Sequence, residues 1–259
     1  AHRMHCMNKQ TSSVEAPQIA LPVKLQGLPG SPYTRKMLAV LRYRHLPYRL
    51  ILNLPQNPDV PGNGEQRATL PVPKVSLLPT FYLKDGAGKL QAVTDSTPII
   101  RRLEQAFEQR SVIPAHPVAR FLNYLLEDYA DEWLWRPALH YRWSYAQDAR
   151  LMGHRIADEM MHDLPAPLWL RRFFITRRQR RVYLRRDGVT PQTIPHIESI
   201  YRRNLVTLNA IFARRPFLLG ARPTLADFGF FASMFRHFGL DPTPARIMRD
   251  EAPHVYEWL

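Results

Sequence analysis

The chain is poor in cysteine, in long apolar runs and in acidic residues relative to basic ones. Its 259 residues include one cysteine, Cys6. That excludes an internal disulfide framework, a cysteine-rich zinc site and a CxxC redox centre. The longest dense apolar patch, residues 228–235, falls far short of the roughly 18 residues that span a bilayer. Because 45% of the residues are hydrophobic, we expect a packed core rather than disorder.

Positive charge is abundant and unevenly placed. Lys and Arg number 36 against 22 Asp and Glu, and 30 of the 36 are Arg. Eight arginines lie in the acid-free stretch from Arg171 to Arg186 (RRFFITRRQRRVYLRR). A local concentration of this kind suggests a partner, whereas diffuse charge mostly affects solubility.

The element pattern changes once along the chain. Residues 22–28 and 48–52 are predicted strands around a helix at 32–45, which indicates a right-handed βαβ unit. Residues 80–84 and 90–93 flank the turn sequence DGAG and predict a hairpin, followed by a helix at 96–110. Beyond that point the pattern predicts only helices, at residues 119–145, 146–162, 168–184, 194–213 and 225–238, and a short one near 244–249. We therefore expect a disordered tail at 1–21, an α/β domain at 22–110 with an irregular segment at 54–74, and a helical domain at 111–259.

Three short patterns on these elements resemble the cytosolic glutathione transferase superfamily. They are the stretch from Gly30 to Lys36 (GSPYTRK) opening the first helix, Leu77-Leu78-Pro79-Thr80 before the third strand, and Asp95-Ser96 before the next helix. The resemblance covers residues 24–240. It implies an α+β protein, with an N-terminal thioredoxin-like domain followed by an all-α domain. It further implies a cytoplasmic enzyme that forms homodimers and uses glutathione as co-substrate.

The resemblance also implies how glutathione binds. Pro79 corresponds to a cis-proline that turns the Leu78 backbone towards the cysteinyl group. Asp95 and Ser96 correspond to the helix N-terminus that receives the γ-glutamyl group. Lys74 is a candidate partner of the glycyl carboxylate. The plainer alternatives are a trans-proline at a strand start and an N-cap without a ligand.

Ser31 is the candidate catalytic residue. A hydroxyl at the N-terminus of the first helix can donate to the glutathione sulfur and lower the pKa of the thiol. The omega-like members of the superfamily have cysteine at this position, so the serine here argues against a mixed disulfide with the enzyme. Tyr33 and Thr34 are alternative hydroxyl donors. Ser31 can also be an N-cap in a protein without activity.

Residues 124–145 are rich in aromatic and acidic side chains. The resemblance places Tyr33, Tyr129 and Trp133 in a pocket for a hydrophobic electrophile, although an interdomain core accounts for these aromatics equally well. Glu127, Asp128, Asp131 and Glu132 lack a histidine three positions on, so we expect no metal site. We interpret these acids as a solvated helix face with an ion pair from Glu132 to Arg136.

These patterns lead to one leading hypothesis and one rival. The first is a glutathione transferase that activates the thiol for attack on a hydrophobic small molecule, by conjugation, ether cleavage or dehalogenation. The rival is a non-catalytic binding or scaffold protein with the same fold. Its Arg171–Arg186 helix would contact an anionic partner such as a membrane surface. We do not expect a nucleic-acid partner, because the chain carries none of the usual fold signatures.

Under the leading hypothesis, positive potential near the pocket would attract the two carboxylates of glutathione. Separately, Thr224 and Asp227 predict a capping box.

Overall fold

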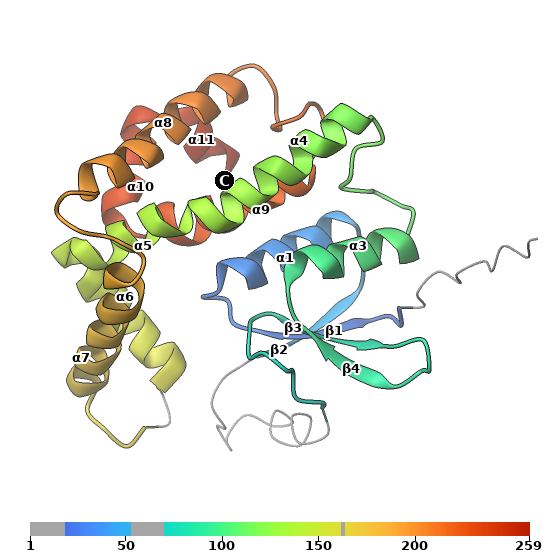
Figure 1. Ribbon diagram of the computed structural model, residues 1–259, viewed down its shortest axis with the longest axis horizontal. Coiled ribbons are helices and arrows are strands. Elements are labelled where there is room, and N and C mark those ends of the chain that lie inside the picture. Colours follow the sequence, from blue (N-terminus) through green and yellow to red (C-terminus); the bar gives the residue numbers. More distant parts are fainter. Residues whose placement is uncertain (1–18, 53–69, 162–163) are drawn as a thin grey trace, which may run out of the picture.

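The computed structural model describes residues 19–52, 70–161 and 164–259 (Figure 1). The predicted tail up to residue 18 and most of segment 54–74 lie outside these residues. The first half contains a four-stranded sheet in the order β2-β1-β3-β4. Its strands are β1 (Val23–Gly27), β2 (Tyr48–Leu52), β3 (Thr80–Lys84) and β4 (Leu90–Val93). β2 runs parallel to β1, and β3 is antiparallel to both β1 and β4, as in a thioredoxin-like sheet.

Helices α1 (Pro32–Tyr43) and α3 (Ser96–Ala106) supply the apolar cover of the sheet (Figure 1). Met37 and Leu41 of α1, Ile99 and Ile100 of α3, and Phe81 of β3 are fully buried in one core. Their helical spacing gives each helix one apolar face, and burying that face drives the packing. The predicted βαβ unit and the hairpin are confirmed.

The second half is helical, with π-helical turns continuing three of its helices. It comprises α4 (Pro117–Asp128), η1 (Tyr129–Trp133), α5 (Trp135–Ser144), α6 (Ala146–Met161), α7 (Leu168–Gln179), η2 (Arg180–Arg185), α8 (Ile194–Phe212), α9 (Leu225–Ser233), η3 (Met234–Phe238), α10 (Pro242–Glu251) and α11 (Pro253–Trp258). The sequence did not predict α11. Within the described residues, no helix combines the length and apolarity needed to cross a membrane.

Helix α9 joins the two halves. Leu225 and Phe228 pack into the core of the sheet domain, while the N–H of Ala226 donates to Asn123 Oδ1 of α4 (2.9 Å). The start of α9 is the predicted capping box, because Asp227 Oδ2 accepts from the Thr224 N–H at 2.8 Å. The predicted fold class is therefore confirmed. In this arrangement α4 and η1 contact the N-terminal parts of α1 and α3, through hydrogen bonds from Lys36, Thr97 and Tyr33.

Candidate functional site

A hollow of about 670 Å³ opens where the two halves meet. Its lining comes from α1, from the loop before β3, from the start of α3 and from α4 with η1. Five residues singled out from the sequence lie together in this lining: Tyr33, Leu78, Pro79, Asp95 and Ser96. The structure thus brings segments about 60 residues apart in sequence to one site.

The loop before β3 presents backbone to the hollow. The Leu78–Pro79 peptide bond is cis, as the sequence predicted. The Thr80 hydroxyl donates to the Leu77 carbonyl at 2.8 Å and fixes the turn into the strand. Leu78 lies just before the strand, where its backbone groups can pair with an extended ligand.

The N-terminus of α3 faces the same hollow. Asp95 is the N-cap, with a positive φ of 79°, and its Oδ1 accepts from the Thr97 N–H at 3.2 Å. Among the described residues, no acceptor takes the N–H of Ser96. A free N–H at a helix N-terminus favours an anionic ligand group.

Ser31 caps the N-terminus of α1 beside this hollow without lining it. Its Oγ accepts from the Thr34 N–H at 3.2 Å. A serine hydroxyl has one donor and two acceptor positions, so capping leaves its proton unused. Among the described residues, no acceptor takes that proton. Ser31 therefore retains the donor that thiolate stabilisation needs.

The two alternative hydroxyl donors are placed differently. The Tyr33 hydroxyl lines the hollow but donates to the Asp131 backbone carbonyl at 3.1 Å. Burial and the nearby acids, Asp131 foremost, raise the pKa of Tyr33 well above its ordinary value. Thr34 is fully buried, with its side chain against Gly27, and does not line the hollow. Of these three hydroxyl groups, only that of Ser31 combines exposure with an unused proton.

A buried lysine ties α1 to the helical domain beneath the hollow. Lys36 Nζ lies 2.6 Å from Glu127 Oε1 and 2.5 Å from Asp131 Oδ2, and donates to Ser96 Oγ at 3.1 Å. The Lys36 side chain is fully buried. The interpretation of these acids as a solvated face is wrong for Glu127 and Asp131. The predicted Glu132–Arg136 ion pair is also not formed; Arg136 instead lies over the Trp133 ring.

Two carboxylates, Glu127 and Asp131, share the one ammonium of Lys36. The pKa of Asp131 reflects this arrangement. Burial raises the pKa of Asp131 to about 6, although the Lys36 charge acts in the opposite direction. In its ordinary state an aspartate titrates at 3.8. Between those values the folded chain holds a proton that the unfolded chain has released. The free energy of unfolding should therefore fall as the pH rises through this window.

We predict that Asp131→Asn removes this pH dependence. Between about pH 4 and pH 7, the wild-type free energy of unfolding should fall by about 2–3 kcal/mol more than that of the variant. Urea denaturation at both pH values measures the difference. Asp128→Asn, at an exposed position at the end of α4, is the matched control and should behave like the wild type. Parallel pH profiles for wild type and Asp131→Asn would contradict the assignment.

The hollow is acidic rather than basic. Asp95, Glu127, Asp128, Asp131 and Glu132 all line it. In the described part of the chain, Arg101 is the only cationic side chain in the lining. The expectation of positive potential around this pocket is therefore wrong at its surface. The sequence contained a signal for this: four acids within six residues, on a helix predicted to face the pocket.

Other predicted residues lie away from the hollow. Lys74 is exposed and does not line it. The Tyr129 hydroxyl accepts from Asn204 Nδ2 at 2.6 Å, and its ring lies near Phe230 in the helical core. Trp133 is 56% exposed and lines no part of the hollow. The aromatic side chains that do line it are Tyr33 and Tyr124.

Sequence reasoning missed a buried cation next to the N-terminus of α1. Arg236 is 4% exposed, and its Nη2 lies 3.1 Å from the position that a Cβ on Gly30 would occupy. Burial lowers the pKa of Arg236 to about 10, so it remains charged at neutral pH. Glu159 Oε2 lies even closer to that position, so a side chain at residue 30 would have to displace the ends of these two flexible side chains. Within the described residues, no group of His, Cys, Asp and Glu side chains has an arrangement suited to a metal ion.

Comparison with known proteins gives consistent results for both halves. Residues 25–111 match the family described as glutathione S-transferase, N-terminal domain, and residues 191–259 match the corresponding C-terminal domain. No curated protein matches the chain at a significant level.

Solved structures share the fold at low sequence identity. A GST-like protein from Pseudomonas syringae has a TM-score of 0.55 and 17% identity; the alignment covers 91% of this chain and 64% of that one, so this chain spans less than two thirds of that protein. A glutathione S-transferase from Rhodospirillum rubrum F11 has a TM-score of 0.53 and 16% identity, over 91% and 85% of the two chains. A family member from Pseudomonas fluorescens Pf-5, solved with two glutathione molecules bound, has a TM-score of 0.50 and 14% identity, over 91% and 86%.

Proposed function

The chain belongs to the glutathione S-transferase superfamily, and from this premise we propose that it binds glutathione in the 670 Å³ hollow and activates the thiol. The observation that carries the proposal is one convergence. The Leu78–Pro79 turn and the N-terminus of α3 face one hollow beside the N-terminus of α1. Such a hollow can bind an extended peptide along the Leu78 backbone. It can also bind an anion at the N-terminus of α3 and a thiolate at the N-terminus of α1.

The polar groups of the hollow match a tripeptide with one ammonium and two carboxylates. The γ-glutamyl carboxylate would meet the free Ser96 N–H, and the ammonium would face Asp95. Arg101, whose guanidinium stands 5.1 Å above the Tyr124 ring, is exposed and lies on the same helix as Ser96, so it can supply positive charge at the γ-glutamyl end. Lys74, the predicted partner of the glycyl carboxylate, does not line the hollow.

The chemistry follows from Ser31. Its hydroxyl would donate a hydrogen bond to the glutathione sulfur, and the α1 dipole acts in the same direction. The thiol proton leaves to solvent. The thiolate sulfur then forms a bond to an electrophilic carbon, and the leaving group departs with the electron pair. Tyr33, Leu77 and Tyr124 supply the apolar surface for a hydrophobic co-substrate.

Isothermal titration with glutathione tests this proposal. We expect saturable heat, and competition by S-alkylated glutathione, which keeps every backbone contact. Ser96→Pro, which removes the free N–H at the start of α3, should abolish the heat in a variant shown to be folded by circular dichroism. An absence of heat with the wild type at millimolar glutathione would overturn the proposal.

We also propose that two copies associate through α4. Val118, Phe121, Leu122 and Leu125 are all exposed and recur at helical spacing, which gives α4 an apolar stripe outside the core. Light scattering should give the mass of a dimer for the wild type. Phe121→Glu together with Leu125→Glu should give a folded monomer, whereas the matched change Val206→Glu on α8, also exposed, should leave the dimer intact. A monomeric wild type would contradict this proposal.

A further inference from the structure

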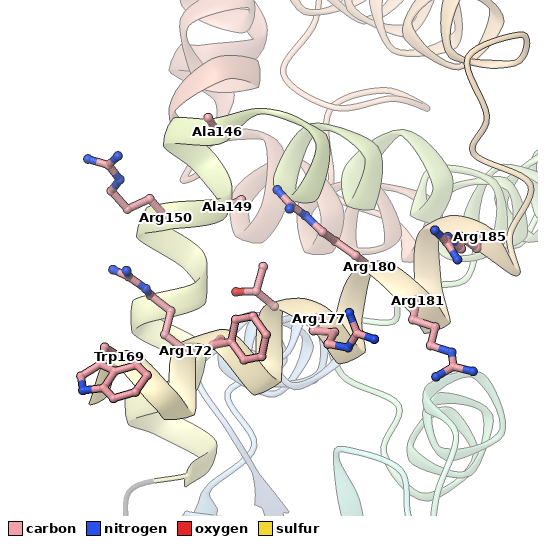
Figure 2. A pocket seen from close by; sticks show the side chains of 11 residues that line it. Ala146, Ala149, Arg150, Trp169, Arg172, Arg177, Arg180, Arg181 and Arg185 are labelled. Atoms are coloured by element: carbon pink, nitrogen blue, oxygen red, sulfur yellow. The ribbon is translucent and has the colours of Figure 1, made fainter. Parts of the chain in front are cut away.

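A second hollow, of about 930 Å³, lies on the hairpin of α6 and α7 with η2 (Figure 2). We call it the arginine groove and define it by the cations that line it: Arg150, Arg172, Arg177, Arg180, Arg181 and Arg185. Arg150 belongs to α6, and the other five belong to α7 and η2. It shares no lining residue with the glutathione hollow.

Small side chains on α6 create the space. The α6 residues facing the groove include Ala146 and Ala149, which fill little of it. One turn further along, Gly153 lets the helices approach, since a Cβ there would lie 2.7 Å from Thr176 Oγ1. The two helices are thus in close contact at Gly153.

The charge in the groove is uncompensated. No carboxylate lines it, and among the described residues none of its six arginines forms an ion pair. Arg180 uses its Nε to donate to the Trp143 carbonyl at 2.9 Å, which fixes that side chain in place. Concentrated like charges are unfavourable for the empty protein, and phosphate groups bind guanidinium through paired charge-assisted hydrogen bonds.

Two aromatic rings stand among the arginines. Trp169 is 65% exposed and Phe173 is 56% exposed, one helical turn apart on the same face of α7 as Arg172 and Arg177. In Figure 2 Trp169 lies at one end of the groove and Arg185 at the other. They lie 16 positions apart along α7 and η2. An exposed indole beside guanidinium groups suits the stacking of a planar ring.

We propose that the arginine groove binds a ligand that combines an aromatic ring with two or more phosphates, as a nucleoside triphosphate does. The ring stacks on Trp169 and Phe173, and the phosphates bind the arginines of α7 and η2. The volume of the groove falls within the range of small-molecule pockets. Its concave shape argues against a membrane surface, which is flat on this scale and would contact the rim alone.

The probe is ATP without added magnesium. Its binding is measured by isothermal titration calorimetry and by quenching of tryptophan fluorescence. We expect saturable binding that weakens as salt is added. Adenosine, which lacks phosphates, and tripolyphosphate, which lacks a ring, should each bind at least about fivefold more weakly.

Matched variants assign the binding to this groove. Trp169→Ala should weaken ATP about fivefold or more, whereas Trp133→Ala, which removes an exposed tryptophan outside the lining, should have no effect. Arg177→Ala with Arg181→Ala should weaken ATP at least about tenfold. The double change Arg178→Ala with Arg186→Ala removes the same charge from the same segment outside the lining and should change the affinity less than twofold. Glutathione binding should be unchanged in all four variants.

Three outcomes would overturn the proposal. The first is no ATP binding at low salt. The second is equal loss of affinity in the lining and non-lining arginine pairs, which would show attraction by net charge alone. The third is tight binding of a single-stranded oligonucleotide or of anionic vesicles that ATP does not displace, which would make the face a surface for a polymer or a membrane.

Discussion

Replacing Lys36 by methionine should lower the free energy of unfolding by about 3–5 kcal/mol. The side chain is fully buried, and its ammonium is the cation shared by Glu127 and Asp131. Removing the ammonium leaves two carboxylates within the protein without a counter-charge, which costs more than the ion pair itself contributes. Because the lysine is on α1 and the acids are on α4 and η1, the loss falls on the contact between the two halves.

Urea denaturation measures this effect, and two further variants make it specific. Lys24→Met, at an exposed position on β1, should change the free energy of unfolding by less than about 0.5 kcal/mol. The triple variant Lys36→Met, Glu127→Gln, Asp131→Asn removes all three charges and should recover most of the stability. A Lys36→Met protein as stable as the wild type would contradict the burial of this cluster.

Replacing Ser31 by alanine should lower turnover about 100-fold, with glutathione still bound. A rate loss of about this size is typical when an enzyme loses one preorganised hydrogen-bond donor that stabilises an anion. The expected cause is a higher pKa of the bound thiol, so the rate should recover in part as the pH is raised. Initial rates with glutathione and an activated aryl chloride, measured across pH, test this.

The N-cap role of Ser31 must be separated from its proposed chemical role, because Ser31→Ala also removes the cap of α1, at about 1 kcal/mol. Ser31→Asp keeps a capping oxygen but has no proton to donate at neutral pH, so it should be stable and inactive. Ser31→Thr keeps both functions and should retain most activity. Tyr33→Phe should have little effect, since that hydroxyl already donates to the Asp131 carbonyl. An active Ser31→Asp enzyme would exclude the serine as the thiol donor.

Much of the fold could be predicted because it depends on local patterns. The strands at 48–52, 80–84 and 90–93 match the structure residue for residue, because Pro47, Pro79 and the DGAG turn mark their ends. The capping box of Thr224 and Asp227 is likewise local. The short α11 was missed because six residues after a proline carry too little periodicity to distinguish a helix from a loop.

The chemistry of the site could be predicted only in part, because it depends on contacts across the chain. The resemblance placed Leu78, Asp95 and Ser96 at one site because each belongs to a short local pattern, and all three line the hollow. Their contact with glutathione stays a prediction. The burial of Glu127 could not be read from α4, since its partner Lys36 lies 91 residues earlier. Tyr129 instead contacts Asn204 and Phe230 of the helical domain. Trp133 ends a π-helical turn, which shifts the phase of the helix relative to the sequence pattern.

A crystal structure with glutathione bound is the most direct test of the central claim. The proposal predicts the tripeptide in the 670 Å³ hollow. Its cysteinyl backbone would pair with Leu78, its γ-glutamyl carboxylate would sit on the Ser96 N–H, and its sulfur would lie within hydrogen-bond distance of Ser31 Oγ. Glutathione bound with its sulfur away from the N-terminus of α1, or bound outside this hollow, would contradict the assignment of the site.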